Sequence, residues 1–167
     1  GHYVVIADLV ERRTKGAIPM FDADKVRAIA QFPLRTRLSG SEYASFSDCP
    51  TVVSISPALL MRLGNRLDIP RLEIMAAHEP DQGLSHKMQY ALLETEWLPK
   101  PSDAAQPLVL DKHNWFGDMA WMIARLDPTD PEAMVLACKG GHNGEFHNQN
   151  DVGSFIVYFN EEPFLID

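Results

Sequence analysis

The chain has few cysteines, few basic residues for its length and no long hydrophobic run. Cys49 and Cys138 lie far apart and match no metal-ligand or redox spacing, so we expect two buried thiols. No segment approaches the roughly 20 apolar residues of a membrane helix, and no signal peptide is visible. With 15 Lys and Arg against 23 Asp and Glu, the net charge of −8 disfavours nucleic acid and anionic membranes as main partners.

The chain is, by contrast, rich in apolar residues. A hydrophobic content of 46% over 167 residues is enough for one ordinary core or the facing parts of two smaller ones. The chain opens with Gly1 in an expected helix and stops at Asp167, at the end of an expected strand. We therefore expect a piece of a longer protein, in which any targeting signal would lie outside this sequence.

The first part of the sequence is predicted to be helical. Tyr3, Ile6, Ala7 and Val10 follow the spacing of one helical face. The full set of expected helices covers residues 2–15, 22–33, 56–66, 70–77 and 84–97. Between the second and third, residues 35–53 are rich in Ser, Thr and Gly and predict a long, ordered surface connection.

The second part of the sequence is predicted to be β structure. The proline-rich stretch that starts at Pro99 marks a boundary between a helical part, 1–98, and a strand-rich part, 99–167. Short apolar runs separated by turn residues predict strands at 107–111, 119–125, 133–139, 153–159 and 162–166. The last two are expected to form a hairpin that turns at Asn160 and Glu161. The expected fold class is α+β, with an antiparallel sandwich.

The segment between two of these strands is dense in groups that bind protons, metals or sugar hydroxyls; it reads His-Asn-Gly-Glu-Phe-His-Asn-Gln-Asn-Asp over 142–151. If residues 147–151 continue into the strand, His147, Gln149 and Asp151 share one face. That face would suit a metal or a sugar. The alternative is a polar loop whose Asn and Asp side chains bind their own backbone.

This segment also carries a resemblance. The run from Gly140 to Tyr158, together with 162–167, resembles the most distinctive stretch of the heparinase II/III-like polysaccharide lyases. The strands expected at 121–125 and 133–139 fit around it. The helix of residues 2–15 and the connection of residues 32–49 resemble the end of that family's helical toroid and its exit into the sandwich. The resemblance implies the C-terminal helices of an α/α toroid followed by part of an antiparallel β-sandwich.

The resemblance implies an activity and a site. Lyases of this family cleave uronic-acid-containing polysaccharides, such as heparin-like, chondroitin-like or alginate chains, by β-elimination. His147 matches the family's catalytic histidine, and an imidazole suits proton transfer or neutralisation of the substrate carboxylate. His142, Asn143 and Asn148 are the expected substrate-binding residues. The expected partner is an acidic polysaccharide or oligosaccharide, and the expected location is periplasmic or secreted.

The metal site implied by the resemblance is altered here. Gln149 stands where the family often has a histidine ligand, and Asp167 stands where an aspartate ligand is expected, so one divalent ion, zinc or calcium, is an open question. Two other functions stay open: a non-catalytic carbohydrate-binding protein and a metal-dependent glycan hydrolase. Tyr3 is favoured as core packing over an acid/base role. Trp115 and Trp121 are favoured as core over sugar stacking.

Overall fold

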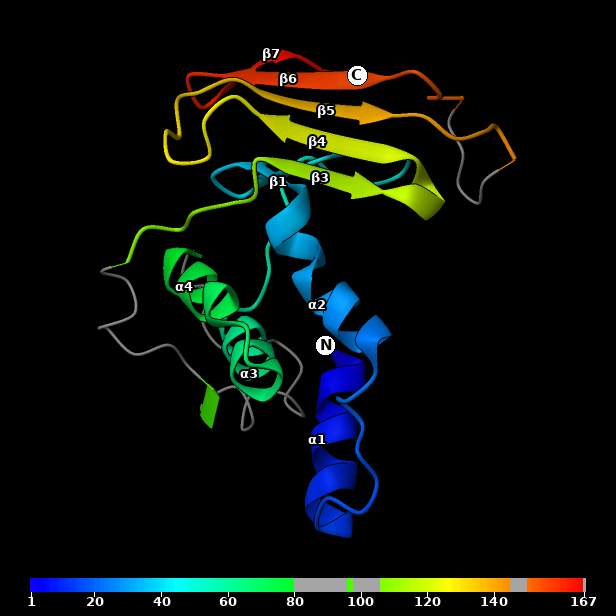
Figure 1. Cartoon of the computed structure of the whole chain (residues 1–167), viewed down its shortest axis with the longest axis vertical. Coiled ribbons are helices and arrows are strands. Elements are labelled where there is room, and N and C mark those ends of the chain that lie inside the picture. The colour runs from blue at the N-terminus through cyan, green and yellow to red at the C-terminus, as the bar shows by residue number, and fades with distance from the viewer. Residues whose placement is uncertain (80–95, 98–105, 145–149, 167) are drawn as a thin grey trace. The chain divides into compact units, whose positions relative to one another are not determined.

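The computed structural model describes residues 1–79, 96–97, 106–144 and 150–166. They form two compact units, one made of Gly1–Phe32 and Ser54–Leu108 and the other of Pro33–Val53 and Val109–Asp167. Within the described part of the chain the fold is mixed α+β, with four helices and two antiparallel sheets, as expected (Figure 1). No helix among these residues is long and apolar enough to cross a membrane.

The helices begin and end close to the predicted positions. Their bounds are α1 His2–Thr14, α2 Asp24–Thr36, α3 Pro57–Leu67 and α4 Pro70–His78. The Ser56 hydroxyl accepts a hydrogen bond from the Leu59 N–H at 3.4 Å and Pro57 follows it, which confirms the predicted start of α3. Lys15 adopts the left-handed conformation that ends α1. The helix expected at 84–97 lies outside the described residues except for 96–97.

The predicted apolar face of α1 is partly wrong. Ala7 is buried, but Tyr3 and Ile6 are 45% and 56% exposed. Asp8 is buried in their place, and its carboxylate pairs with the guanidinium of Arg62 and, at 2.7 Å, with that of Arg12. The face that packs inward therefore includes an ionised residue, which a pattern of apolar positions cannot predict.

Helix α2 also runs further than predicted, because Pro33 lies inside it rather than at its end. A proline inside a helix removes the hydrogen bond to the carbonyl four residues earlier. That carbonyl belongs to Ile29, which is 63% exposed, so water can take the place of the missing donor. The helix thus continues to Thr36, where the chain enters the sheet unit.

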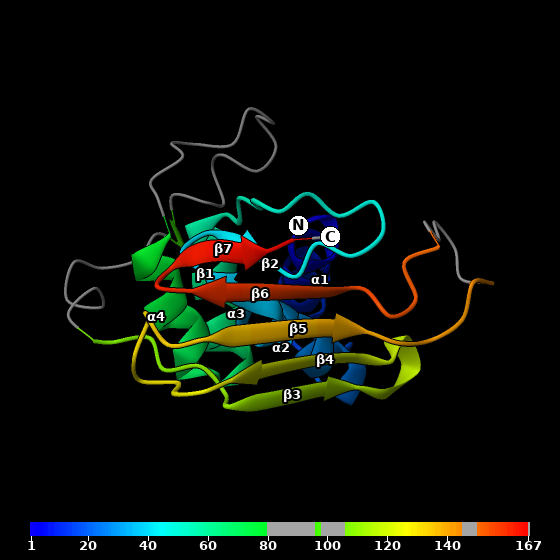
Figure 2. The same ribbon diagram turned by 90° about the horizontal axis from the view of Figure 1, so that it is seen from above.

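The larger sheet is an antiparallel meander of five strands in sequence order. Its strands are β3 His113–Phe116, β4 Trp121–Arg125, β5 Val135–Lys139, β6 Phe155–Phe159 and β7 Glu162–Leu165, seen side by side in Figure 2. Asn160 and Glu161 have φ of 56° and 60°, so the predicted β6–β7 hairpin is confirmed with the left-handed turn that such hairpins favour. The predicted strand at 107–111 is wrong, since the chain pairs only from His113.

One face of this sheet is buried. Ile123, Ala137, Ile156 and Tyr158 point from three neighbouring strands into a common core. The segment predicted as a surface connection supplies the other side of it, with the short strands β1 Arg37–Ser39 and β2 Glu42–Tyr43 and the buried side chains of Leu38, Ala44 and Phe46. The prediction of a surface position was wrong, because the three apolar residues outweigh the surrounding Ser and Thr.

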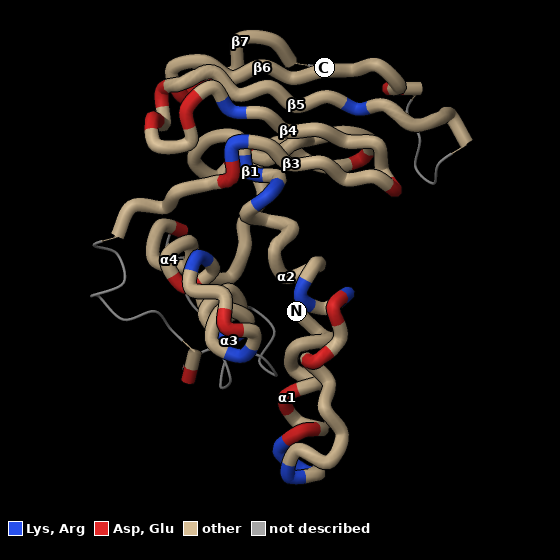
Figure 3. Tube along the Cα trace, in the orientation of Figure 1, with Lys and Arg blue, Asp and Glu red and all other residues tan. Residues whose placement is uncertain are grey.

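The opposite face of the sheet is exposed and almost uncharged. Within the strands β3 to β7 the only Lys, Arg, Asp or Glu residues are Arg125, Lys139 and Glu162, so these strands are mostly tan in Figure 3. Trp115 and Phe159 on this face are 61% and 59% exposed. The core assignment of Trp115 is therefore wrong.

Three other side chains show how burial differs from expectation. Trp121 packs against the core, with its ring centroid 5.1 Å from that of Phe46, as expected. Cys49 is exposed and Cys138 is half-buried, so the expectation of two buried thiols is not met; both are free. The exposed thiol lies in the turn that follows Phe46, where the chain returns to solvent.

Candidate functional site

The polar segment singled out in the sequence joins β5 to β6. The structure describes its two ends, 140–144 and 150–154. His147, Asn148 and Gln149 lie outside the described residues, and so does Asp167. The geometry that bears on the candidate site is therefore that of the two ends and of what holds them.

Backbone hydrogen bonds bring the two ends together. The N–H of Lys139 donates to the Ser154 carbonyl at 2.9 Å, and the N–H of Gly153 donates back to the Lys139 carbonyl at 2.8 Å. Gly140 donates to the Ala120 carbonyl at 2.8 Å. A Cβ at Gly140 would lie only 3.3 Å from the Ala120 Cβ and carbonyl oxygen, so the close approach favours glycine there.

The strand predicted at 153–159 begins at Phe155 and does not extend back to Asp151. β6 starts at Phe155, Asn150 has a φ of 59°, and the N–H of Ser154 donates to the Asp151 carbonyl at 3.1 Å. Residues 150–154 thus form a turn, so of the two alternatives the strand does not continue back through Asp151. The two-residue alternation that would align His147 with Asp151 does not reach Asp151.

Asp151 instead points into the protein and forms a buried ion pair. Its Oδ1 lies 2.6 Å from the Nζ of Lys139, and the two side chains are 5% and 1% exposed. Ser47 completes the group: its N–H donates to Asp151 Oδ2 at 2.9 Å, and its hydroxyl accepts from Lys139 Nζ at 2.9 Å. We call the residues Ser47, Lys139 and Asp151 the clamp.

The clamp favours the ionised form of Asp151. Burial opposes ionisation, but hydrogen bonds from Lys139 and from the Ser47 backbone outweigh it, so the pKa of Asp151 lies below its ordinary value. Ser47 has a φ of 59°, an unusual conformation for a residue other than glycine. Its backbone is thus held in the orientation that aims its N–H at the carboxylate.

His142 and Asn143 lie in the end of the segment that follows β5, and both are exposed. The Nδ1 of His142 accepts a hydrogen bond from the Gly144 N–H at 3.1 Å. A neutral ring with Nδ1 as acceptor carries its proton on Nε2. The Nε2–H of this exposed residue can therefore donate to an oxygen-rich ligand, and the substrate-binding role expected for His142 stays a prediction.

Within the described ranges, no group of three or more His, Cys, Asp or Glu side chains is arranged to hold a metal ion. Asp151 in particular has both carboxylate oxygens engaged, one by Lys139 and the other by Ser47. It therefore does not fit as a metal ligand. The ligands implied by the resemblance, Gln149 and Asp167, belong to the undescribed residues.

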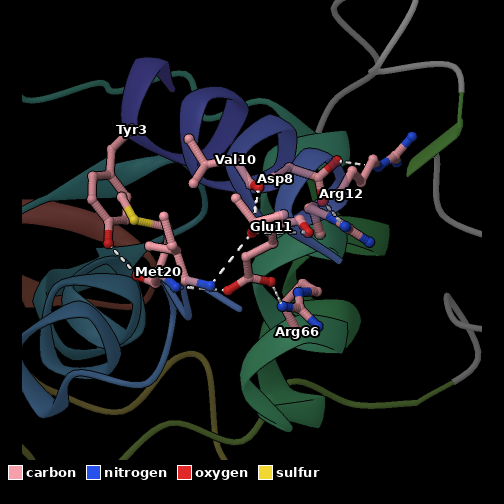
Figure 4. A network of polar contacts seen from close by, with 10 residues as sticks. Tyr3, Asp8, Val10, Glu11, Arg12, Met20 and Arg66 are labelled. Carbon is pink, nitrogen blue, oxygen red and sulfur yellow. Dashed lines mark hydrogen bonds and ion pairs between the residues drawn. The ribbon is translucent and has the colours of Figure 1, made fainter. Parts of the chain in front are cut away.

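Tyr3 belongs to a polar network on α1 that is drawn in Figure 4. Its hydroxyl donates to the Met20 carbonyl, and its ring stands edge-on to that of Phe21, with centroids 6.3 Å apart. The N–H of Met20 in turn donates to Glu11 Oε1 at 2.7 Å, and Glu11 pairs with Arg66. The half-exposed Tyr3 side chain thus holds the segment after α1 through Met20, and the expected core position of Tyr3 is wrong.

The remaining histidines show no clustering in the described residues. The Nε2 of His78 lies 2.9 Å from the Gln106 carbonyl, a contact within the helical unit, and His113 is exposed on β3. They are ordinary surface residues, as expected, whereas His86 lies outside the described residues.

The sequence reasoning missed Lys139 and Ser47. A signal for Lys139 was present, because Val135, Ala137 and Lys139 alternate along one strand and the first two point inward. A lysine at the next inward position needs a buried carboxylate partner. Ser47 had no comparable signal, since 104 residues separate it from Asp151.

Comparison with known proteins adds no assignment. No protein-family model matches the chain, and no curated protein shows significant sequence similarity to it. The resemblance of residues 140–167 to the heparinase II/III-like lyases therefore stays a prediction from the sequence.

Proposed function

We propose that the protein is part of a polysaccharide lyase that cleaves uronic-acid-containing acidic polysaccharides by β-elimination. The observation that carries the proposal is the ordered likeness of Gly140–Tyr158 and Glu162–Asp167 to the signature of the heparinase II/III-like lyases. In the same proposal, the helices belong to the end of an α/α toroid, the sheet to a β-sandwich, and the protein acts in the periplasm or outside the cell.

The roles follow from the chemistry of elimination. A base must remove the proton beside the uronate carboxylate, and the charge that develops there must be stabilised. We assign proton transfer or carboxylate neutralisation to His147. His142 offers an Nε2–H donor, and Asn143 and Asn148 offer amide groups for sugar hydroxyls.

The test is the release of unsaturated uronate from heparin, chondroitin sulfate and alginate by the full-length protein, followed by ultraviolet absorbance. His147→Ala should lower the rate by about 10²–10⁴-fold, the usual contribution of one positioned acid or base. His113→Ala, at an exposed position on β3, is the matched control and should leave the rate unchanged. A His147→Ala protein with the wild-type rate would remove this residue from the mechanism.

Gln149 favours a second candidate, a carbohydrate-binding family member without catalysis, because an amide replaces the metal-binding histidine of the family. Calorimetry on the full-length protein separates the two. Stoichiometric oligosaccharide binding without turnover would establish the binder, whereas turnover would establish the lyase.

The proposal includes one divalent cation, zinc or calcium, with Gln149 and Asp167 as ligands. An amide and a carboxylate oxygen suit calcium better than zinc. Elemental analysis of the purified protein, before and after dialysis against a chelator, tests this part separately. A metal-dependent glycan hydrolase would require tightly bound metal and would release products without the ultraviolet absorbance of an unsaturated sugar.

A further inference from the structure

The clamp is unusual for its surroundings. Lys139 continues the inward row that begins with Val135 and Ala137 in the apolar core of the sheet unit, yet Lys139 and Asp151 are charged and almost fully buried. Apolar residues of similar volume often stabilise a protein as well as a buried ion pair does. The pair therefore calls for a role other than overall stability.

The position of the clamp in the chain indicates that role. Lys139 is the last residue of β5, immediately before the polar segment, and Asp151 is a buried residue in the turn 150–154 at the other end of the segment. Ser47 comes from the separate segment 33–53 and contacts both. The clamp thus joins the two ends of the polar segment to each other and to the core of the same unit.

Direct chemistry by the clamp is disfavoured. A serine next to a lysine is the arrangement of a nucleophile and its base, but the base must be unprotonated to activate the hydroxyl. Asp151, at 2.6 Å, favours the ammonium form of Lys139, and that ammonium donates to the Ser47 hydroxyl rather than accepting its proton. Ser47 is therefore a fastened residue and not an activated nucleophile.

We propose that Ser47, Lys139 and Asp151 are positioning residues: they hold the two described ends of the polar segment, 140–144 and 150–154, and the proton transfer proposed for His147 depends on this support. This inference rests on the proposed function for the part that concerns His147. Proton transfer is sensitive to such support, because a displacement of about 1 Å at a catalytic group can lower a rate about 100-fold.

The first experiment needs no substrate. In the full-length protein, Lys139→Met combined with Asp151→Leu removes both charges together and keeps an apolar interior. Hydrogen–deuterium exchange is then measured in peptides that cover 140–144 and 150–154. We expect their exchange to rise about tenfold or more while that of the β6–β7 hairpin stays unchanged, because only the ends of the segment lose their fastening.

Two further variants serve as a milder test and as a control for this measurement. Ser47→Ala removes only the hydroxyl that accepts from Lys139, so it should give a smaller rise in the same peptides even if the double variant fails to fold. Lys112→Met, at an exposed lysine before β3, is the matched control and should change nothing. Wild-type exchange at both ends of the segment in Ser47→Ala and in a folded double variant would overturn the inference.

The second experiment separates positioning from stability. In the double variant, assayed well below its unfolding midpoint so that the protein is folded, kcat should fall about 100-fold while KM changes less than about threefold. If the pair served stability alone, the folded double variant would keep the wild-type kcat. That result would overturn the assigned role. If the wild-type protein cleaves none of these polysaccharides, both the proposed function and the catalytic role of His147 are refuted. The exchange measurement then decides by itself whether the clamp holds the two described ends of the segment.

Discussion

Breaking the Lys139–Asp151 pair should lower stability strongly, whereas removing it whole should not. Lys139→Met leaves the Asp151 carboxylate buried without its lysine partner, while Ser47 still donates to it, and Asp151→Leu leaves the buried ammonium without its carboxylate partner. Removing one partner of a buried pair typically lowers the free energy of unfolding by about 3–5 kcal/mol. The surviving contacts to Ser47 place Lys139→Met near the lower end of that range.

The double variant supplies the decisive comparison. It has no unpaired charge, and its remaining defect is the Ser47 N–H, which loses its acceptor at a cost of about 1–3 kcal/mol. The two single effects would sum to about 6–10 kcal/mol if they were independent, so the interaction energy should exceed about 3 kcal/mol. Urea unfolding at neutral pH measures all four proteins, with Lys112→Met as the surface control. Single effects below about 1 kcal/mol, or effects that add in the double variant, would refute the argument.

The same pair has a defined pH dependence. The folded-state pKa of Asp151 lies below its ordinary value of 3.8, so its contribution is present above that value and is lost as the pH falls through the folded-state pKa. The stability difference between wild type and Asp151→Asn should therefore be constant near neutral pH and shrink in acid below about pH 4. A difference that grows on acidification would contradict the assigned direction.

Three further outcomes follow from the sheet unit. Burial, followed by the nearby carboxylates, raises the pKa of Tyr158 from 10.0 to about 12. The folded protein therefore resists ionisation of this phenol, and wild type should lose stability relative to Tyr158→Phe as the pH rises from 10 to 12. Urea unfolding of both proteins over this pH range measures the loss, and a stability difference that does not change with pH would refute it. Ile156→Ala should lower the free energy of unfolding by about 2–5 kcal/mol, whereas Phe159→Ala, on the exposed face, should lower it by less than about 1 kcal/mol. Urea unfolding measures both effects, and the reverse order would place the core on the other face of the sheet. Glu161 has a φ of 60°, a left-handed conformation that costs a residue other than glycine about 1 kcal/mol. Glu161→Gly should therefore raise the thermal unfolding midpoint by a few degrees, and a lowered midpoint would show that the Glu161 side chain stabilises the turn.

Local patterns in the sequence predicted most of the described elements. Ser56 followed by Pro57 marks a helix start by itself, and the alternation around Val157 with a turn at Asn160 specifies a hairpin. In these cases the deciding interactions lie within a few residues of each other. Strand β3 was missed because its sequence His-Asn-Trp-Phe carries little strand signal, and its place is set by pairing with β4.

The candidate site was predicted less completely. The sequence located the polar segment and its first residues His142 and Asn143, but it left open whether Asp151 lies on a ligand-binding face or in a polar loop. In the structure the carboxylate faces Lys139, because residues 150–154 form a turn and not an extended strand. One turn is enough to reverse the direction of a side chain that alternation had placed.

The sequence by itself therefore determined the α+β class, the described helices and the β6–β7 hairpin. Each of these depends on neighbouring residues along the chain. The tertiary structure alone decided that segment 33–53 enters the core, that Asp8 is buried on α1, and that Ser47 meets Lys139 and Asp151. The physical reason is the same for all three: the partner that makes burial favourable is distant in sequence, and no local pattern contains it.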